Sequence, residues 1–180
     1  MNFKLNFGWF NIYLESTIFR TRNGDVAYGY TNRCEDGKYI VCIDYDKIDL
    51  QWIIPELKRL QQDFSLSHFY IFRSSKKSYH AVCFDKLCLN SLLTVLRSSS
   101  VDLNYINVPL KYGAKIWTLR ITDKQNIPVE FVGRVASVYS TTEKSLPHMK
   151  FTRKIFDIKN MDIKNNDQSD KMLFSSYRLQ

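Results

Sequence analysis

Residues Tyr39–Asp46 read YIVCIDYD. This stretch begins as a nearly unbroken apolar run, as expected of a strand bound for a core, but it ends in two aspartates one residue apart. Residues i and i+2 of a strand point to the same face, roughly 6.6 Å apart along the chain, so Asp44 and Asp46 share a face. The pair is either a solvated strand end or the beginning of a metal site.

Two turn signals precede this strand. Asn23-Gly24 and Asp36-Gly37 each lie between segments of strand-like composition. Asn-Gly and Asp-Gly supply the positive φ angles that tight hairpin turns need. We therefore predict an N-terminal β-meander with strands at 13–22, 25–32 and 38–45.

The segments after Tyr39 alternate in type. An amphipathic stretch, LQWIIPELKRLQQDF, predicts a helix that begins near Ile54, with Pro55 in its first turn. The strands SHFYIFRSS and SYHAVCF follow, then a second helix that Asp85 caps, then a strand at 116–122. The order strand, helix, strand, strand, helix, strand is typical of a split β-α-β core. The sequence thus predicts an α+β fold, with an RNA-recognition or ferredoxin-like core behind the meander.

Length and composition indicate one domain. The chain has 180 residues, of which 44% are hydrophobic and 14% aromatic, enough for a single core that we place at residues 1–156. Residues 157–180 are rich in Lys, Asn, Asp and Ser, so we predict a mobile C-terminal tail. No stretch approaches the roughly 18 consecutive apolar residues of a membrane span, and the N-terminus is too polar for a secretory signal.

Cysteine usage and charge bear on location and partners. The four cysteines lack C-x-x-C spacing, which favours buried free thiols in a reducing, intracellular compartment. The formal net charge is +8, with 26 Lys and Arg against 18 Asp and Glu. This balance favours a polyanionic partner, and we expect nucleic acid rather than a membrane surface.

The predicted core brings distant acids to one edge of its sheet. If the first strand is central and antiparallel to the third, its C-terminal end meets the beginning of the third strand, where Ser78 and His80 share a face. Asp102 follows the second helix and is expected near the same edge. Three carboxylates, from Asp44, Asp46 and Asp102, suit a two-metal site for Mg²⁺ or Mn²⁺.

Asp123 competes with Asp102 for the third carboxylate position. If residues 116–122 form a regular fourth strand of the sheet, Asp123 lies roughly 20 Å from the beginning of that strand, so we prefer Asp102. Basic residues surround these acids in the sequence. Candidates for binding a nucleotide, with Ser78 and His80, are Arg73, Lys76, Arg120 and Lys124, and candidates for binding a nucleic-acid backbone are Lys77, Lys150, Arg153 and Lys154.

Four short motifs occur in a recognisable order. They are Asp44-Tyr45-Asp46 at a strand end, Ser78-Tyr79-His80 after a basic turn, Val101-Asp102, and WTLRITDK with Arg120 and Lys124. Over about residues 38–125 the chain resembles the archaeo-eukaryotic primase superfamily, particularly the primase-polymerases of plasmids and viruses. The glycine that usually precedes the family's histidine is absent.

The resemblance implies an enzyme that performs metal-dependent nucleotidyl transfer on a nucleic-acid template. It implies two Mg²⁺ or Mn²⁺ ions on the carboxylates, with a nucleoside triphosphate held by His80 and the basic residues. The expected activity is that of a primase, a DNA polymerase or both, in the replication of a mobile element or virus. Expected partners are a DNA template and primer, and a separate helicase or other replication protein.

Two other functions remain open. A rolling-circle replication initiator would nick single strands with a tyrosine, and Tyr112 and Lys115 have Y-x-x-K spacing. A non-catalytic module on the same fold would stack bases on aromatic side chains and hold phosphates by its positive charge.

Overall fold

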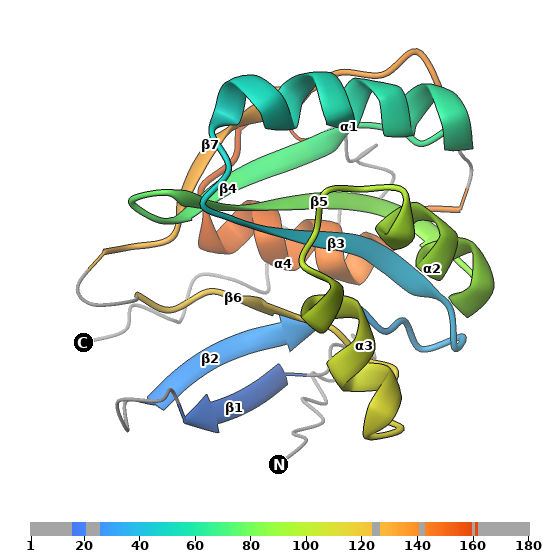
Figure 1. Ribbon diagram of the computed structural model, residues 1–180. Coiled ribbons are helices and arrows are strands. Elements are labelled where there is room, and N and C mark those ends of the chain that lie inside the picture. Colours follow the sequence, from blue (N-terminus) through green and yellow to red (C-terminus); the bar gives the residue numbers. More distant parts are fainter. Residues whose placement is uncertain (1–15, 21–25, 124–126, 141–142, 160, 162–180) are drawn as a thin grey trace, which may run out of the picture.

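The protein is an α+β fold with two antiparallel sheets (Figure 1). The computed structural model describes residues 16–20, 26–123, 127–140, 143–159 and 161, and side chains from Tyr28 onward. The predicted fold class is confirmed at this level. The elements are β1 Ser16–Arg20, β2 Val26–Thr31, β3 Tyr39–Asp46, α1 Leu50–Phe64, β4 Phe69–Ser75, β5 Ser78–Leu87, α2 Leu89–Arg97, α3 Leu103–Lys111, β6 Thr118–Arg120, β7 Glu130–Val135 and α4 Leu146–Ile155.

The larger sheet has the strand order β3-β5-β4-β7, and both of its faces are covered. Alternate residues of β3 point to opposite faces. Val41 and Ile43 belong to a buried cluster with residues of α1 and α2, whereas Ile40 and Cys42 belong to a second cluster with residues of α4, β2 and β6. The sheet therefore lies between a layer with α1 and α2 and a layer with α4 and the smaller sheet (Figure 1).

Helix α1 begins earlier than the sequence predicts. It runs from Leu50 and contains Pro55 in its interior, so the predicted beginning near Ile54 is wrong. A proline there removes one backbone hydrogen bond. The helix continues because Ile53, Leu57 and Leu60, spaced along one stripe, are all buried against the sheet.

The pairing of β6 differs from the prediction. Residues 116–122 were expected as the fourth strand of the core sheet, but β6 pairs with β2 in the smaller sheet, whose order is β1-β2-β6. Two contacts fix this arrangement. Asn32 and Trp117 exchange hydrogen bonds of 2.8 and 3.0 Å. A Cβ on Gly29 would lie only 2.5 Å from the Leu119 carbonyl oxygen, so the close approach of β6 requires glycine.

Strand β3 is consequently an edge strand of the larger sheet, not a central one. Its free edge is covered by α3, whose Tyr105 hydroxyl donates a 3.1 Å hydrogen bond to the Cys42 carbonyl. The predicted meander is also only partly right. Strands β1 and β2 pair as a hairpin, but β3 leaves them because both of its faces are apolar and suit a strand buried between two layers.

Two helices escaped the sequence prediction. Residues 103–111 form α3 and residues 146–155 form α4. Asp85, predicted to cap the second helix, instead lies within β5 and accepts a 2.7 Å hydrogen bond from the Ser67 amide. Ile158 and Met161 fall in the stretch predicted as a tail, yet both are buried. The rest of that tail lies outside the described residues, apart from Asp157 and Lys159.

His148 of α4 ties that helix to the smaller sheet. Its Nε2 lies 2.8 Å from the Thr31 carbonyl oxygen and its Nδ1 lies 2.6 Å from the Ser145 hydroxyl. A carbonyl only accepts, so Nε2–H donates to Thr31 and the neutral ring accepts from Ser145. Burial lowers the pKa of His148 to about 4.

This burial predicts a loss of stability at mildly acidic pH. The unfolded chain binds the proton near the ordinary pKa of about 6.5, and the folded chain does so only near 4. The contribution is therefore present above pH 6.5 and is lost as the pH falls toward 4, by about 3 kcal/mol in the free energy of unfolding. Urea titrations at several pH values should show this slope, and His148→Gln should flatten it. An equal slope in both proteins would contradict the assignment.

All four cysteines are free, as predicted, but only Cys34, Cys42 and Cys83 are buried. Cys88 is exposed at the N-terminal end of α2, and the Ser91 hydroxyl 3.2 Å away lowers the pKa of its thiol. Burial raises the pKa of the other three thiols.

Thiol labelling should separate Cys88 from the others. Because the thiolate is the reactive form, a disulfide reagent at neutral pH is expected to modify Cys88 rapidly in the folded protein. The three buried thiols should react only after denaturant is added. Cys88→Ser should remove the rapid phase, and rapid reaction of a second thiol in that variant would contradict the burial.

Candidate functional site

Two antiparallel strands place the predicted acids and histidine opposite each other. In the pairing of β3 with β5, Asp44 lies opposite His80 and Asp46 lies opposite Ser78. The four residues occupy one face of the sheet, the face that α4 and the smaller sheet cover farther along the strands. The structure therefore brings together these residues, which the sequence separates by more than 30 positions.

His80 is nearly enclosed and only half satisfied. It is 7% exposed, and its Nε2 lies 3.2 Å from Oδ1 of Asp44. Its Nδ1 is buried and has no hydrogen-bond partner in the described part of the chain. An unsatisfied buried polar atom costs about 1–3 kcal/mol, so this nitrogen is an unusual feature that suggests a ligand.

Arg120 approaches the same face from the other sheet. Its Nη2 donates a 2.7 Å hydrogen bond to the Ser74 carbonyl of β4, while its Nη1 is buried without a partner among the described residues. Burial lowers the pKa of Arg120, and the charges of Asp44, Asp123 and Asp46 oppose that shift. An arginine remains protonated at any physiological pH, so a cation lies among these carboxylates.

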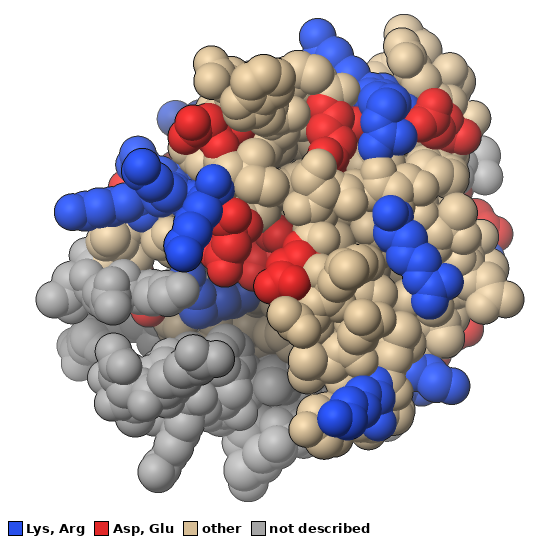
Figure 2. All heavy atoms as spheres, viewed as in Figure 1, with Lys and Arg blue, Asp and Glu red and all other residues tan. Residues whose placement is uncertain are grey.

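We call Asp44, Asp46, Ser78, His80 and Arg120 the β3–β5 site. It lies where the end of β3 and the beginning of β5 meet β6 (Figure 1). Figure 2 shows acidic side chains near the middle of the visible side of the molecule, with basic side chains directly beside them on the side where the β4–β5 turn projects in Figure 1.

Asp102 has a different local role from the predicted one. It is the N-cap residue of α3, and its Oδ1 accepts a 2.9 Å hydrogen bond from the Asn104 amide. The described residues contain no group of three or more His, Cys, Asp or Glu side chains that could hold a metal ion. A ready-made set of Asp44, Asp46 and Asp102 is thus not formed, and the metal role of Asp102 stays a prediction.

The reason for preferring Asp102 over Asp123 no longer applies. That preference assumed that β6 is the fourth strand of the larger sheet, with Asp123 at its far end. Because β6 belongs to the smaller sheet, Asp123 lies close enough to Arg120 for its charge to act on that guanidinium together with Asp44 and Asp46.

The other predicted basic residues are scattered. Arg73 forms an ion pair with Glu130 of β7, so its charge is already compensated. Lys76 and Lys77 are exposed in the β4–β5 turn. Lys150, Arg153 and Lys154 lie on α4, and Lys124 falls outside the described residues.

Sequence reasoning missed two neighbours of the site. The partly buried Tyr105 of α3 feels the charge of Asp44, and burial raises the pKa of its hydroxyl well above its usual value. Ser74 contributes only a carbonyl, which no sequence pattern reveals.

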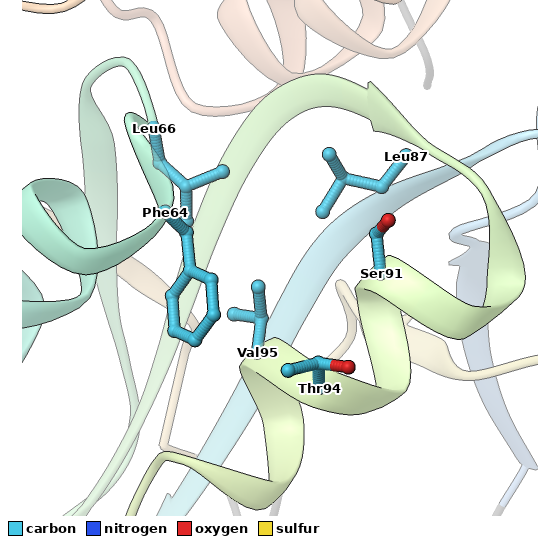
Figure 3. A pocket seen from close by; sticks show the side chains of 6 residues that line it. All are labelled: Phe64, Leu66, Leu87, Ser91, Thr94 and Val95. Atoms are coloured by element: carbon cyan, nitrogen blue, oxygen red, sulfur yellow. The ribbon is translucent and has the colours of Figure 1, made fainter.

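A pocket lined by described residues lies elsewhere. It is a hollow of about 240 Å³ between the C-terminal end of α1 and α2, and it contains none of the predicted site residues (Figure 3). Its lining is Phe64, Leu66, Leu87, Ser91, Thr94 and Val95.

Comparisons with known proteins give no identity. No protein-family model, curated protein or solved structure matches the chain. The resemblance to primase-polymerases therefore rests on the motifs alone. Among the described residues, no helix is long and apolar enough to cross a membrane.

Proposed function

We propose that the protein is a metal-dependent nucleotidyltransferase of the primase-polymerase type, and that the β3–β5 site is its active centre. One observation carries the proposal. Asp44 and His80 form a cross-strand pair, Arg120 joins them from the second sheet, and His80 and Arg120 each keep a buried nitrogen without a hydrogen-bond partner among the described residues. The unpaired Arg120 N–H beside carboxylates suits a triphosphate that arrives with a divalent cation.

The donor set fits Mg²⁺ or Mn²⁺. Asp44 is partly exposed and Asp46 is exposed, so both offer hard carboxylate oxygens to solvent. Mg²⁺ in nucleotide sites is commonly held by one or two carboxylates together with substrate phosphates, and a third protein ligand is not required. When bound, the cations would lower the pKa of the attacking 3′-hydroxyl and neutralise charge on the triphosphate.

Arg120, His80 and Ser78 would position the nucleotide. Arg120 would donate its unpaired Nη1–H to a phosphate oxygen while Nη2 stays anchored on Ser74. At His80, Nε2 faces a carboxylate oxygen that only accepts, so Nε2 carries the hydrogen. Nδ1, which is buried and has no hydrogen-bond partner among the described residues, is then the nitrogen left to face the nucleotide. Ser78 adds a hydroxyl donor opposite Asp46.

The direct test is incorporation of labelled nucleotides by the purified chain. We expect extension of a primed single-stranded template with Mn²⁺ or Mg²⁺ and none with EDTA. Reactions without primer, with dNTPs or NTPs, would report priming. Failure to incorporate any nucleotide with either metal would reject the proposal. We further propose that the activity serves replication of a mobile element or virus, together with a separate helicase or replication protein.

The same preparation tests the rolling-circle alternative. Tyr112 directly follows α3 and is 76% exposed, so it is accessible to a DNA strand. That alternative requires a covalent adduct between Tyr112 and a 5′-phosphate after incubation with single-stranded DNA and metal. Peptide mapping of such an adduct would replace the proposal with the nicking reaction.

A further inference from the structure

Two loops next to the β3–β5 site carry exposed lysines. The amide of Lys47, just after β3, donates a 2.8 Å hydrogen bond to the carbonyl of Lys77 in the β4–β5 turn, so the two loops lie side by side. Lys47, Lys76 and Lys77 are exposed, and none of these ammonium groups forms an ion pair with a described residue. We call these residues the lysine rim.

Trp52 is an exposed tryptophan in α1, the helix that follows Lys47 in the chain. Trp52 is 68% exposed, whereas Trp117 is 2% exposed. The backbone amide of Trp52 donates a 3.0 Å hydrogen bond to the Asp49 carbonyl. Trp52 therefore lies in the first turn of α1, directly after the loop that contains Lys47. A single exposed aromatic is ordinary by itself. An exposed indole close in the chain to exposed lysines is a combination with which proteins bind single-stranded nucleic acid.

We propose that the lysine rim and Trp52 bind single-stranded nucleic acid, with phosphates on the lysines and an unpaired base stacked on the indole. The inference deepens the proposed function by naming the surface that holds the template strand beside Asp44 and Asp46. A single strand fits better than a duplex because stacking on an indole needs an unpaired base. Lys47 directly follows Asp46 in the chain, so the rim adjoins the acids of the β3–β5 site.

The first experiment measures binding without catalysis. Fluorescence anisotropy of a labelled 20-nucleotide oligothymidylate would be recorded in EDTA, without nucleoside triphosphate. Trp52→Ala should weaken binding by about tenfold or more, since stacking on one aromatic contributes on that scale. Trp52→Phe keeps an aromatic face and should restore most of the affinity. Equal affinity of wild type and Trp52→Ala would overturn the inference.

The second experiment tests the lysines through salt dependence. For single strands, log K falls with log salt by about 0.7 for each phosphate contact, so replacing Lys47, Lys76 and Lys77 by Gln should reduce the slope by about two. The matched control removes the same charge from other exposed lysines, by Lys111→Gln, Lys115→Gln and Lys159→Gln, and should leave the slope unchanged. An equal reduction in the control would show net charge alone and overturn the inference.

Other partners and the proposed function are distinguished by the same series. Duplex DNA that binds as tightly and with the same dependence on Trp52, or tighter binding to phosphatidylserine vesicles than to the oligonucleotide, would overturn the inference. Asp44→Asn should abolish incorporation without weakening oligonucleotide binding. Incorporation that survives Trp52→Ala together with unchanged binding rejects the surface but not the active site, whereas binding without any incorporation rejects the active site but not the surface.

Discussion

The double variant Asp44→Asn/Asp46→Asn is expected to lose nucleotide incorporation by a factor on the order of 10³ or more, while its melting temperature changes little. Asparagine keeps the size of each side chain but removes the negative charge that would hold a divalent cation. The fold should tolerate the change because Asp46 is exposed and Asp44 is only partly buried, at the end of β3. Primer extension with Mn²⁺ and thermal unfolding measure the two quantities separately.

A matched control lies three residues farther along the chain. Asp49 is exposed, and although it is the N-cap residue of α1 its side chain makes no capping hydrogen bond. Asp49→Asn makes the same chemical change in the adjoining loop and should keep wild-type incorporation. Equal activity of wild type and the Asp44→Asn/Asp46→Asn variant would remove the basis of the proposed function. An equal loss in Asp49→Asn would show that the assay reports general surface charge.

The third carboxylate can be identified in the same assay. Asparagine caps helices about as well as aspartate, so Asp102→Asn should keep the N-cap of α3 and test only the charge. Asp123→Asn makes the same test at the residue whose charge reaches Arg120. Loss of incorporation in one of these variants, with the other active, would assign the position.

Local signals in the sequence predicted the elements around the site. The alternation of Ser78 and His80, the apolar run before Asp44 and the amphipathic stripe of α1 each depend on neighbours within a few positions. The structure has strands and a helix there, with Asp44 opposite His80. Hydrophobic periodicity was sufficient to predict these elements because each of them contributes apolar side chains to a buried cluster on a face of the larger sheet.

The arrangement of β6 was not predictable in the same way. A strand of alternating pattern fits either sheet, and the choice depends on the exchange of hydrogen bonds between Asn32 and Trp117, residues 85 positions apart, and on space above Gly29. Helix α3 was missed because Pro109 and Gly113 suggested a loop. In the structure Pro109 lies inside the helix and Gly113, with φ of 70°, follows its end.

The candidate site was likewise predictable only in part. Its acids and histidine come from one pair of neighbouring strands, and the hydrophobic pattern of a strand specifies its register. Arg120 was predicted from a motif, but it reaches the site from β6 of the smaller sheet and not from a fourth strand of the larger sheet, as was expected. Tyr105 and the Ser74 carbonyl reach the site through tertiary packing, which no local pattern encodes.

Replacing Arg120 by Ala is expected to lower kcat/KM for incorporation by about 10²–10³, the usual cost of removing one donor that faces developing charge. Arg120 is the described cation that lies among the carboxylates of the site and still has a buried N–H without a partner. Its loss would leave triphosphate charge uncompensated both in the bound substrate and in the transition state. Single-turnover kinetics should therefore show weaker nucleotide binding and a slower chemical step together.

Arg120→Lys separates charge from geometry. An ammonium group cannot hold the Ser74 carbonyl and a phosphate with the planar fork of a guanidinium, so Lys should restore only part of the activity. Both variants lose the hydrogen bond to Ser74, and each should cost about 1 kcal/mol in the free energy of unfolding. A structural role alone predicts that loss of stability with unchanged nucleotide affinity. Affinity that falls in Ala and partly returns in Lys requires that Arg120 contact the triphosphate, and this would place the smaller sheet in the active centre beside β3 and β5.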